Sequence, residues 1–468
     1  MNVKKNRAAS AVTFSAVEFT GWVRGVPQNL PASFCGVTQD TRDLKPGMLY
    51  VAVRGERYNG HDFIQKAFEA GAAAALVDQE LADIPAATRW PLIRVADTRR
   101  ALLDAARAWR ARSTAKIVGV TGSSGKTTTR EIAAAFFSGA GRVCGTYGNR
   151  NNEIGLPLSI LSMEPDCEFG LFELGTNRQG EIALLAETLL PDVGVITSVG
   201  SAHIENFGTT EAIADEKGAL LKALASDGFA VLSMEMAHFE RLRRTYGGRV
   251  VTVSLVDKSA DFYGEIIDVM CGHVAVTEKA SGARLELRSG LPGQYNVYNL
   301  MLAFAAARGT GVAAETAKKL LVDIEITGMR WQRFKTEGGV NFINDAYNAN
   351  PESVKAVLEV FQRLTSVGRK VVVLGDMLEL GTHAESGHRG VGAAVAAVHP
   401  DLLCLVGPLA RQFIAHEAVS IGLAREKVLC FEDAAAAGRA LAGWLRSDDL
   451  VLLKGSRGMR LEEMLDEI

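Results

Sequence analysis

"GVTGSSGKTTTREIAAAFF" (residues 119–137) decides how the whole chain is interpreted. The apolar run ending at Val120 predicts a β-strand, and the run after Lys126 predicts a helix. Between them lies a glycine-rich turn with the composition of a phosphate-binding loop, formed by Gly122, Ser123, Ser124, Gly125, Lys126, Thr127 and Thr128. Such a loop turns backbone N–H groups toward an anion at the positive end of the helix dipole. We expect Lys126 to reach terminal phosphates and the Thr127 hydroxyl to hold Mg²⁺.

A tight strand–helix turn with a surface lysine is the alternative, because Val120 stands where the strict phosphate-loop pattern has glycine. Further residues bear on this choice. Glu173 ends an apolar strand, a position where an open α/β sheet binds ligands and where a carboxylate can hold Mg²⁺. His203 follows another strand, although a lone histidine is more often structural. Lys217 lies on an amphipathic helix and by composition is an ordinary solvated residue.

The composition excludes several classes of protein. With 468 residues, 48% hydrophobic and 22% charged, the chain is long enough for two to four globular domains. Its net charge of −3 provides no overall basic field for nucleic acid or an anionic membrane. No run approaches the roughly 20 apolar residues of a membrane helix, and none has signal-peptide form. Six scattered cysteines without a C-x-x-C pair argue against a zinc site or a disulfide framework and fit the cytosol.

Strand and helix patterns divide the chain into three regions, 1–112, 113–326 and 327–468. The first mixes short strands with a helix and ends in an Ala/Arg-rich helix over 98–113. The second and third alternate strands with helices, which predicts mostly parallel sheets covered by helices. Strands such as "KVVVLGD" (370–376) and "DLLCLVG" (401–407) are continuously apolar, as expected of strands buried on both faces.

Several segments resemble, in order, the motifs of one enzyme family. They are "TGSSGKTT" (121–128), "NRNNEIGLPLSIL" (149–161), "FELGTNRQGEI" (172–182), "SAHIENFG" (201–208), "GQYNVYN" (293–299), "NDAYNANPESV" (344–354), "LGDMLELG" (374–381) and "LLKGSRGMRLEEM" (452–464). Over nearly its whole length the chain resembles the Mur ligases, ATP-dependent amide-forming enzymes of peptidoglycan synthesis. "YNANP", "GDMLELG" and "KGSR" resemble the member that joins D-alanyl-D-alanine to UDP-N-acetylmuramoyl-tripeptide.

The resemblance implies an α/β protein of three domains. These are an N-terminal α/β domain that binds the UDP-substrate (1–112), a central P-loop ATPase-like domain with a parallel sheet (113–326), and a C-terminal Rossmann-like domain that binds D-alanyl-D-alanine (327–468). It further implies a cytoplasmic monomer that uses ATP and two Mg²⁺ ions, with no nucleic-acid partner and no membrane insertion. The tripeptide carboxylate would attack the γ-phosphate, and the dipeptide amine would then attack the resulting acyl phosphate.

The resemblance also implies roles for particular residues. Lys126, Glu173, His203 and Lys217 match catalytic positions, and the last three, with Thr127, match metal ligands, Lys217 as its carbamate. The nucleotide site would include the phosphate loop and Asn296, Asn299, Arg330 and Asp345. Substrate-binding positions would be Asp40, Thr41, Arg42, Asn59, Gly60, His61, Asn151, Asn152, Tyr347, Asn348 and Asn350. The dipeptide would meet the face of the third domain that carries Asp376, Glu379, His383, His388, Lys454, Ser456 and Arg457.

Three other readings compete with this one. A sister ligase that adds the third amino acid usually carries an Asn-Pro-Arg motif in its third domain, which this chain lacks. Folylpolyglutamate synthetase differs in its loop and acceptor motifs. A non-catalytic ATP-binding protein on the same fold is disfavoured by intact Lys126, Glu173, His203 and Lys217.

Overall fold

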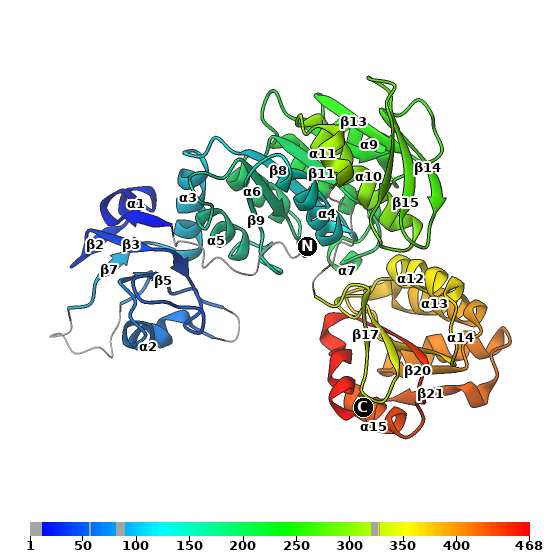
Figure 1. Ribbon diagram of the computed structural model, residues 1–468. Helices are drawn as coiled ribbons and strands as arrows, with labels where there is room; N and C mark the ends of the chain where they lie inside the picture. Colours follow the sequence, from blue (N-terminus) through cyan, green and yellow to red (C-terminus); the bar gives the residue numbers. More distant parts are fainter. Residues whose placement is uncertain (1–11, 56–57, 81–88, 320–325, 327) are drawn as a thin grey trace.

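The computed structural model describes residues 12–55, 58–80, 89–319, 326 and 328–468, and it forms three bodies (Figure 1). A central body joins an N-terminal body on one side and a C-terminal body on the other. The boundary expected at 326/327 falls on residue 327, which lies outside the described residues. No described helix has the length and apolar character needed to cross a membrane.

The central body is built on a nine-stranded sheet in the order β16-β15-β14-β13-β12-β11-β8-β10-β9. Its strands are β8 (Lys116–Thr121), β9 (Val143–Gly145), β10 (Phe169–Glu173), β11 (Val193–Ile196), β12 (Phe229–Ser233), β13 (Arg249–Ser254), β14 (Phe262–Asp268), β15 (His273–Glu278) and β16 (Arg284–Arg288). Its helices are α4 (Lys126–Ser138), α5 (Gly155–Leu161), α6 (Glu181–Leu189), α7 (Ile204–Phe207), α8 (Thr210–Lys222), α9 (Phe239–Thr245), α10 (Gln294–Gly309) and α11 (Ala314–Lys319). β8 to β14 run parallel, and β14, β15 and β16 extend the sheet as an antiparallel edge.

The N-terminal body holds a five-stranded sheet, β2-β7-β6-β5-β4, and a two-stranded sheet, β1-β3. The strands are β1 (Thr13–Ser15), β2 (Val26–Gln28), β3 (Ser33–Cys35), β4 (Val37–Thr38), β5 (Leu49–Val51), β6 (Ala74–Val77) and β7 (Leu92–Arg94). The helices are α1 (Ala16–Trp22), the 3₁₀ turn η1 (Gly60–Phe63), α2 (Ile64–Glu69) and α3 (Thr98–Arg110). α3 belongs to both bodies, because its Trp109 Nε1 donates to Met163 O (3.1 Å) and its Arg110 Nε donates to Leu189 O (3.0 Å).

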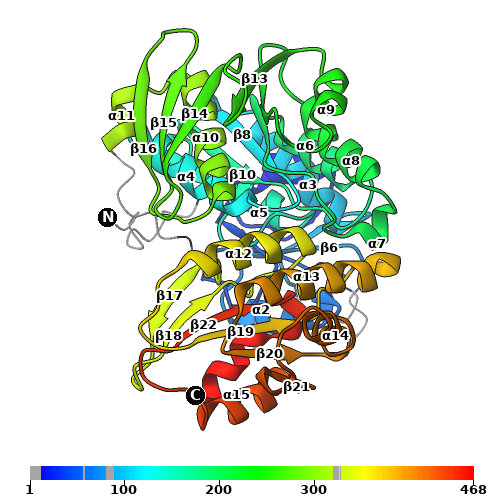
Figure 2. The same ribbon diagram turned by 90° about the vertical axis from the view of Figure 1, so that its right-hand side faces the viewer.

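The C-terminal body has a six-stranded sheet, β17-β18-β22-β19-β20-β21, in which only the β17–β18 pair is antiparallel. Its strands are β17 (Gln332–Lys335), β18 (Asn341–Asn344), β19 (Lys370–Gly375), β20 (Leu402–Val406), β21 (Val428–Phe431) and β22 (Leu450–Lys454). Its α-helices are α12 (Pro351–Arg363), α13 (Ala384–Val398), α14 (Ala415–Ser420) and α15 (Ala434–Ala442). In Figure 2, α12 and α13 lie between this sheet and the central body, and α15 covers the other face.

Burial on both faces explains the continuously apolar strands of the C-terminal sheet. Val372 and Leu374 of β19 belong to one hydrophobic cluster, and Val371 and Val373 belong to another on the opposite face. Because alternate residues of a strand point to opposite faces, both sets must be apolar. The expected α/β fold with three domains is therefore confirmed.

Two findings differ from, or extend, the sequence expectations. Cys144 and Cys167 are paired as a disulfide, with their Cα atoms 6.1 Å apart, and the other four cysteines are free, so there is one cross-link and no disulfide framework. Sequence spacing could not reveal the pair, because β9 and the segment before β10 meet only in the folded sheet.

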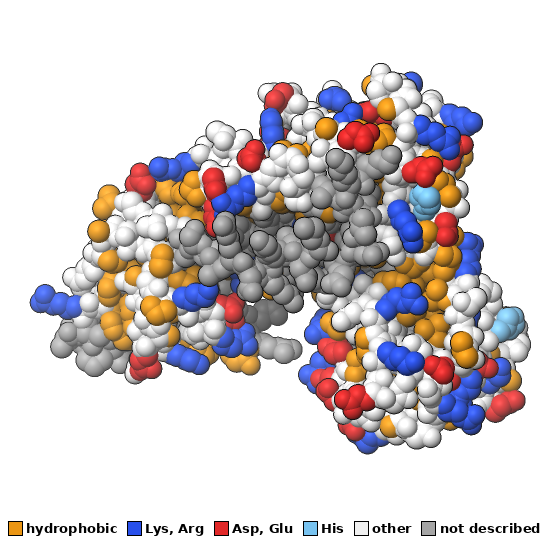
Figure 3. Space-filling model, in the orientation of Figure 1, with side chains coloured by type: hydrophobic (Ala, Val, Ile, Leu, Met, Phe, Trp, Pro, Cys, Tyr) orange, Lys and Arg blue, Asp and Glu red, His pale blue; other side chains and the backbone are white. Residues whose placement is uncertain are grey.

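On the face shown in Figure 3, acidic and basic side chains are interspersed over the C-terminal body, as the near-neutral net charge predicts.

Candidate active site

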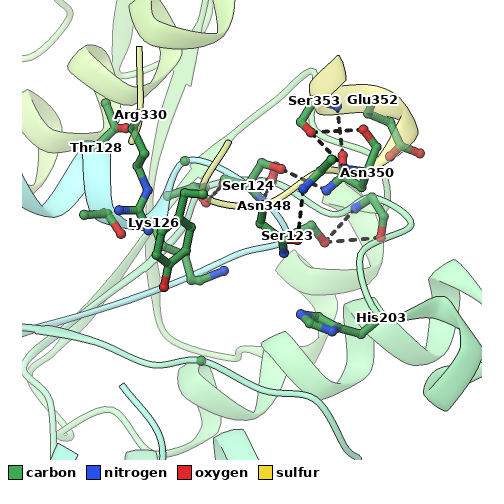
Figure 4. Close-up of a pocket in the computed structure, with 18 of the residues that line it drawn as sticks. Ser123, Ser124, Lys126, Thr128, His203, Arg330, Asn348, Asn350, Glu352 and Ser353 are labelled. Carbon is green, nitrogen blue, oxygen red and sulfur yellow. Dashed lines mark hydrogen bonds between the residues drawn. The ribbon is translucent and has the colours of Figure 1, made fainter. Parts of the chain in front are cut away.

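A cleft of about 1080 Å³ lies between the central and C-terminal bodies, and the phosphate loop lines it. Residues from α3, from the carboxyl ends of the central strands and from the start of the C-terminal domain also line it. Such a position, outside the carboxyl ends of parallel strands, is where open α/β sheets bind ligands. Figure 4 shows Ser123 and Ser124 of the loop facing Asn350 of the C-terminal domain across this cleft.

The phosphate loop has the backbone that its two glycines were expected to allow. Gly125 immediately precedes α4 with a φ of +86°, and a Cβ there would lie 2.4 Å from Asn299 Oδ1. Gly122 has a φ of +155°, and a Cβ there would lie 2.0 Å from Thr197 Oγ1. Lys126 folds back over the loop, its Nζ donating to Gly122 O at 2.8 Å, and burial lowers the pKa of its ammonium group. An anion in the loop would therefore meet the Lys126 ammonium group and the N-terminus of α4.

Thr127 and Glu173 form a buried pair beside the loop. The Thr127 hydroxyl donates to Glu173 Oε2 at 2.7 Å, and Asn151 Nδ2 donates to Glu173 Oε1 at 2.8 Å. Arg130, also buried, has its Nε 4.0 Å from Glu173 Oε2. A hydroxyl and a carboxylate are oxygen ligands of the kind that Mg²⁺ prefers, so these two residues fit a magnesium site.

Lys217 is not the solvated residue that its composition suggests. It lies on α8 with only 3% of its surface exposed, and none of the hydrogen bonds or ion pairs among the described residues involves its ammonium group. Burial first, and the nearby Lys126 charge second, lower its pKa to about 7. A lysine with this pKa is largely a neutral amine just above neutral pH, which is the form that reacts with CO₂.

His203 lines the same cleft but faces the C-terminal domain. Its Nδ1 contacts Glu379 Oε2, and Figure 4 shows its ring apart from the serines of the loop. Its Nε2 takes part in no hydrogen bond among the described residues. Within that part of the chain, no three His, Cys, Asp or Glu side chains are grouped to hold a metal ion unaided. The structure thus brings Thr127 and Glu173 together and leaves His203 with one nitrogen available.

Asn296 and Asn299 are buried on α10 and bond to protein groups. Asn296 Nδ2 donates to Pro292 O (2.8 Å), and Asn299 Nδ2 donates to Asn296 Oδ1 (3.1 Å). Asn299 Oδ1 also accepts from Thr129 Oγ1 (3.2 Å), which ties α10 to α4. Both residues line the cleft.

Arg330, Tyr347 and Asp345 gather at the entrance to the C-terminal domain. The Arg330 guanidinium lies 3.7 Å from the centre of the Tyr347 ring. Asp345 Oδ1 accepts from Trp331 N (2.8 Å), and its Oδ2 pairs with the buried Lys454 ammonium at 2.7 Å. Met329 and Trp331 have positive φ values of 50° and 51°, so Asp345 and Lys454 hold a constrained segment around Arg330.

Asn348 and Asn350 lie where α12 begins. Asn350 Oδ1 accepts from Ser353 N (2.8 Å) and Asn350 N donates to Ser353 Oγ (3.1 Å), which is a capping box followed by proline. Asn348 O accepts from Lys454 Nζ (2.9 Å). Asn350 therefore caps α12, and its side-chain amide nitrogen also reaches Ser124 of the phosphate loop (Figure 4).

The expected substrate residues of the N-terminal domain do not line the cleft. Asp40 and Arg42 form an ion pair with each other (2.6 Å), which lowers the pKa of the Asp40 carboxyl. His61 is buried, with its Nδ1 2.8 Å from Asn59 Oδ1 and its Nε2 accepting from Asp78 N (3.2 Å). Asn59, Gly60 and His61 therefore support the local fold, while Thr41 stands between the paired Asp40 and Arg42. Asn152 lines the cleft and also accepts from Gly155 N (2.8 Å) at the start of α5.

Sequence reasoning missed several cleft residues. Arg99 of α3 pairs with Glu153 beside the loop, and both line the cleft. Tyr298 donates to Glu235 Oε2 (3.1 Å), and both residues also line the cleft. No short stretch of sequence predicts either pair, because each pair joins segments that are distant in the sequence.

Comparison with known families covers most of the chain. The Mur ligase middle domain matches residues 120–307, the Mur ligase glutamate ligase domain matches residues 329–457, and the Mur ligase family catalytic domain matches residues 34–110.

Individual relatives match over almost their full length. The UDP-N-acetylmuramoyl-tripeptide–D-alanyl-D-alanine ligase of Bacillus subtilis (strain 168) is 35% identical, with 94% of both chains covered. Crystal structure I of MurF from Acinetobacter baumannii is 26% identical with a TM-score of 0.86, covering 98% of this chain and 99% of that one. MurF ligase from Thermotoga maritima in complex with ADP is 27% identical with a TM-score of 0.77, covering 92% and 96%.

Proposed function

Because this chain belongs to the Mur ligase family, we propose that it joins D-alanyl-D-alanine to UDP-N-acetylmuramoyl-tripeptide. ATP drives the reaction, which yields UDP-N-acetylmuramoyl-pentapeptide, ADP and phosphate. The observation that carries the proposal is the phosphate loop with its Thr127–Glu173 pair in a cleft between the central and C-terminal domains. Full-length similarity to ligases of this name supports the choice of substrates. We assign the reaction to the cytoplasm and the active form to a monomer.

The chemistry must bring a carboxylate up to a polyanionic phosphate. Lys126, half-buried in the loop, and Arg330, which also lines the cleft, supply positive charge to the transferring phosphoryl group. Positive charge that is already in place before the reaction stabilises the transition state without any rearrangement of the site. This stabilisation is the main catalytic contribution in phosphoryl transfer. Asn296 and Asn299 line the part of the cleft that we assign to the adenine.

Thr127 and Glu173 are the residues that would hold one Mg²⁺. His203 Nε2 and the carbamate of Lys217 would hold a second, and the low pKa of Lys217 supports its carbamylation. Bound Mg²⁺ would neutralise charge on the phosphates and on the acyl phosphate that follows. Asn151 holds the Glu173 carboxylate in place through the second oxygen.

The peptide substrates are assigned to the two outer domains. The UDP end lies with Asp40, Thr41, Arg42 and the 59–61 loop, and Asn151 and Asn152 face the incoming tripeptide. Tyr347, Asn348 and Asn350 border the site of phosphoryl transfer and the dipeptide. The dipeptide amine attacks the acyl carbon, and the tetrahedral intermediate expels phosphate. Because acyl phosphates hydrolyse, closure of the domains must exclude water, and we assign one hinge to the segment near residue 113.

One assay tests the proposal directly. Purified protein, ATP, Mg²⁺ and UDP-N-acetylmuramoyl-tripeptide are mixed, and phosphate release is measured with and without D-alanyl-D-alanine. Release that requires the dipeptide, with a pentapeptide product by mass spectrometry, is expected. Release only with a single amino acid and a shorter precursor would move the assignment to a sister ligase. ATP binding without phosphate release under any substrate set would overturn catalysis.

A further inference from the structure

An ion pair between His203 and Glu379 crosses the boundary between the central and C-terminal domains. His203 immediately precedes α7 of the central domain, and its Nδ1 contacts Glu379 Oε2. Glu379 lies in the loop after β19, in the C-terminal domain, and lines the same cleft. The His203 and Glu379 side chains are 20% and 47% exposed, so the pair is partly shielded from solvent on the histidine side.

The backbone around the pair is built for close approach. His203 and Glu379 both have φ values of +62°, which non-glycine residues adopt only when the surroundings support it. Glu205 N donates to Glu379 O at 3.2 Å, so the two loops are also joined through their backbones. A Cβ at Gly381, two residues on, would lie 3.1 to 3.3 Å from atoms of Glu205. The His203–Glu379 side-chain pair is therefore held by two residues with constrained backbones. A backbone hydrogen bond and a close contact at Gly381 hold the same two loops together.

We propose that Glu379 is a positioning residue for metal binding: it holds His203 with Nδ1 protonated and Nε2 free to bind the ion. A carboxylate at Nδ1 accepts a hydrogen bond from Nδ1–H and so selects this tautomer, as in the carboxylate–histidine pairs of other metal sites. The inference rests on the proposed function, because it requires His203 to be a metal ligand.

This arrangement links the metal site to domain docking. Glu379 reaches His203 only while the C-terminal domain lies against the central domain. Docking therefore strengthens metal binding, and by reciprocity the bound metal strengthens docking. The domain that we assign to the dipeptide would thus complete the metal site of the domain that binds ATP.

Mn²⁺ binding to the full chain tests the proposal without relying on turnover. Free Mn²⁺ is measured by electron paramagnetic resonance with a non-hydrolysable ATP analogue present. Glu379→Ala is expected to weaken the His203-dependent Mn²⁺ site about 10- to 100-fold, the range for loss of a carboxylate behind a ligating histidine. Glu379→Gln should lose less, because its amide oxygen still accepts from Nδ1–H.

Two further variants separate the possible explanations. Glu352→Ala removes the Ser201 Oγ–Glu352 Oε2 hydrogen bond (2.8 Å) at the same interface and leaves His203 untouched. An equal loss of Mn²⁺ in Glu352→Ala and Glu379→Ala would mean that only docking matters, and would overturn the proposal. If His203→Ala leaves Mn²⁺ binding intact, the metal role in the proposed function fails. If His203→Ala weakens binding and Glu379→Ala does not, the metal role stands and the positioning role fails.

The tautomer gives a second, independent readout. Histidine-selective ¹⁵N spectra, assigned with His203→Asn, should show Nδ1 protonated in the wild type and a shift toward Nε2–H in Glu379→Ala. The same tautomer in both proteins would contradict the proposal. Thermal unfolding of each variant establishes that the fold is retained.

Discussion

Asn350 Nδ2 donates a hydrogen bond to Ser124 Oγ, 3.2 Å away, and so joins the N-cap of α12 to the phosphate loop. The two residues are 226 positions apart and belong to different domains. The same Asn350 side chain caps α12 through Ser353 N. One amide therefore both begins a helix and orients the C-terminal domain on the nucleotide site.

Substitutions at Asn350 should separate these two roles. Asn350→Ala removes the cap and should lower the free energy of unfolding by about 1 kcal/mol. Asn350→Ser is also a good cap but is too short to reach Ser124, so stability should stay near wild type. The serine variant loses the hydrogen bond to Ser124, which is worth about 1 kcal/mol. Its dipeptide-dependent phosphate release should therefore fall roughly fivefold. Urea unfolding and the phosphate assay check both, and a serine variant with wild-type turnover would contradict the docking role.

Lys126 should be the most sensitive position for turnover. Removing one preorganised charge from a transferring phosphoryl group costs about 10² to 10³ in rate, so Lys126→Met should lose that much. Lys116, at the start of strand β8, which leads into the phosphate loop, is half exposed and pairs with Asp192 (3.1 Å), which makes it a matched control. Lys116→Met should keep wild-type phosphate release. Near-normal turnover in Lys126→Met would remove the loop from the mechanism.

The features that the sequence predicted correctly are local. The phosphate loop is read from seven consecutive residues, and the alternation of apolar strands with helices predicts both parallel sheets. Each such feature depends on backbone preferences and burial within a short window. The helix cap of Asn350 has a local signal too, since proline follows it.

What the sequence left out depends on contacts between distant segments. His203 and Glu379 are 176 residues apart, and no periodicity indicates that their loops meet. Lys217 has the composition of a solvated helix residue, yet packing buries it. The antiparallel edge β14–β16 was not expected, because strands after β13 carry no signal for their neighbour in the sheet. The site roles given to Asp40 and His61 stay predictions.

The carbamate on Lys217 should depend on pH in a defined direction. Only the neutral amine reacts with CO₂, and the pKa of Lys217 is lowered to about 7 by burial and by Lys126. As pH falls through this value the amine becomes protonated, so the carbamate and phosphate release should both decline. With ¹³C-bicarbonate, a carbamate resonance should appear above this pH and fade below it. Its persistence in Lys217→Met would assign it to another lysine.

The buried pair of Lys454 and Asp345 should be a major source of stability in the C-terminal domain. Lys454 Nζ lies 2.7 Å from Asp345 Oδ2, with side-chain exposures of 4% and 15%. Lys454→Met would leave a carboxylate nearly buried without its cation, and breaking such a pair costs about 3 to 5 kcal/mol. Urea unfolding should show this loss in the transition of the C-terminal domain.

A double-mutant cycle identifies the cause of that loss. If the cost comes from the stranded charge, Lys454→Met combined with Asp345→Asn should destabilise less than the sum of the two single variants. Lys335 forms an exposed pair with Asp448 (3.2 Å) on the edge strand β17, so Lys335→Met is the matched control. It should cost no more than about 1 kcal/mol, because exposed pairs contribute little. Equal losses at Lys335 and Lys454, or strictly additive effects at Lys454 and Asp345, would show that the buried pair does not hold the Arg330 segment as inferred.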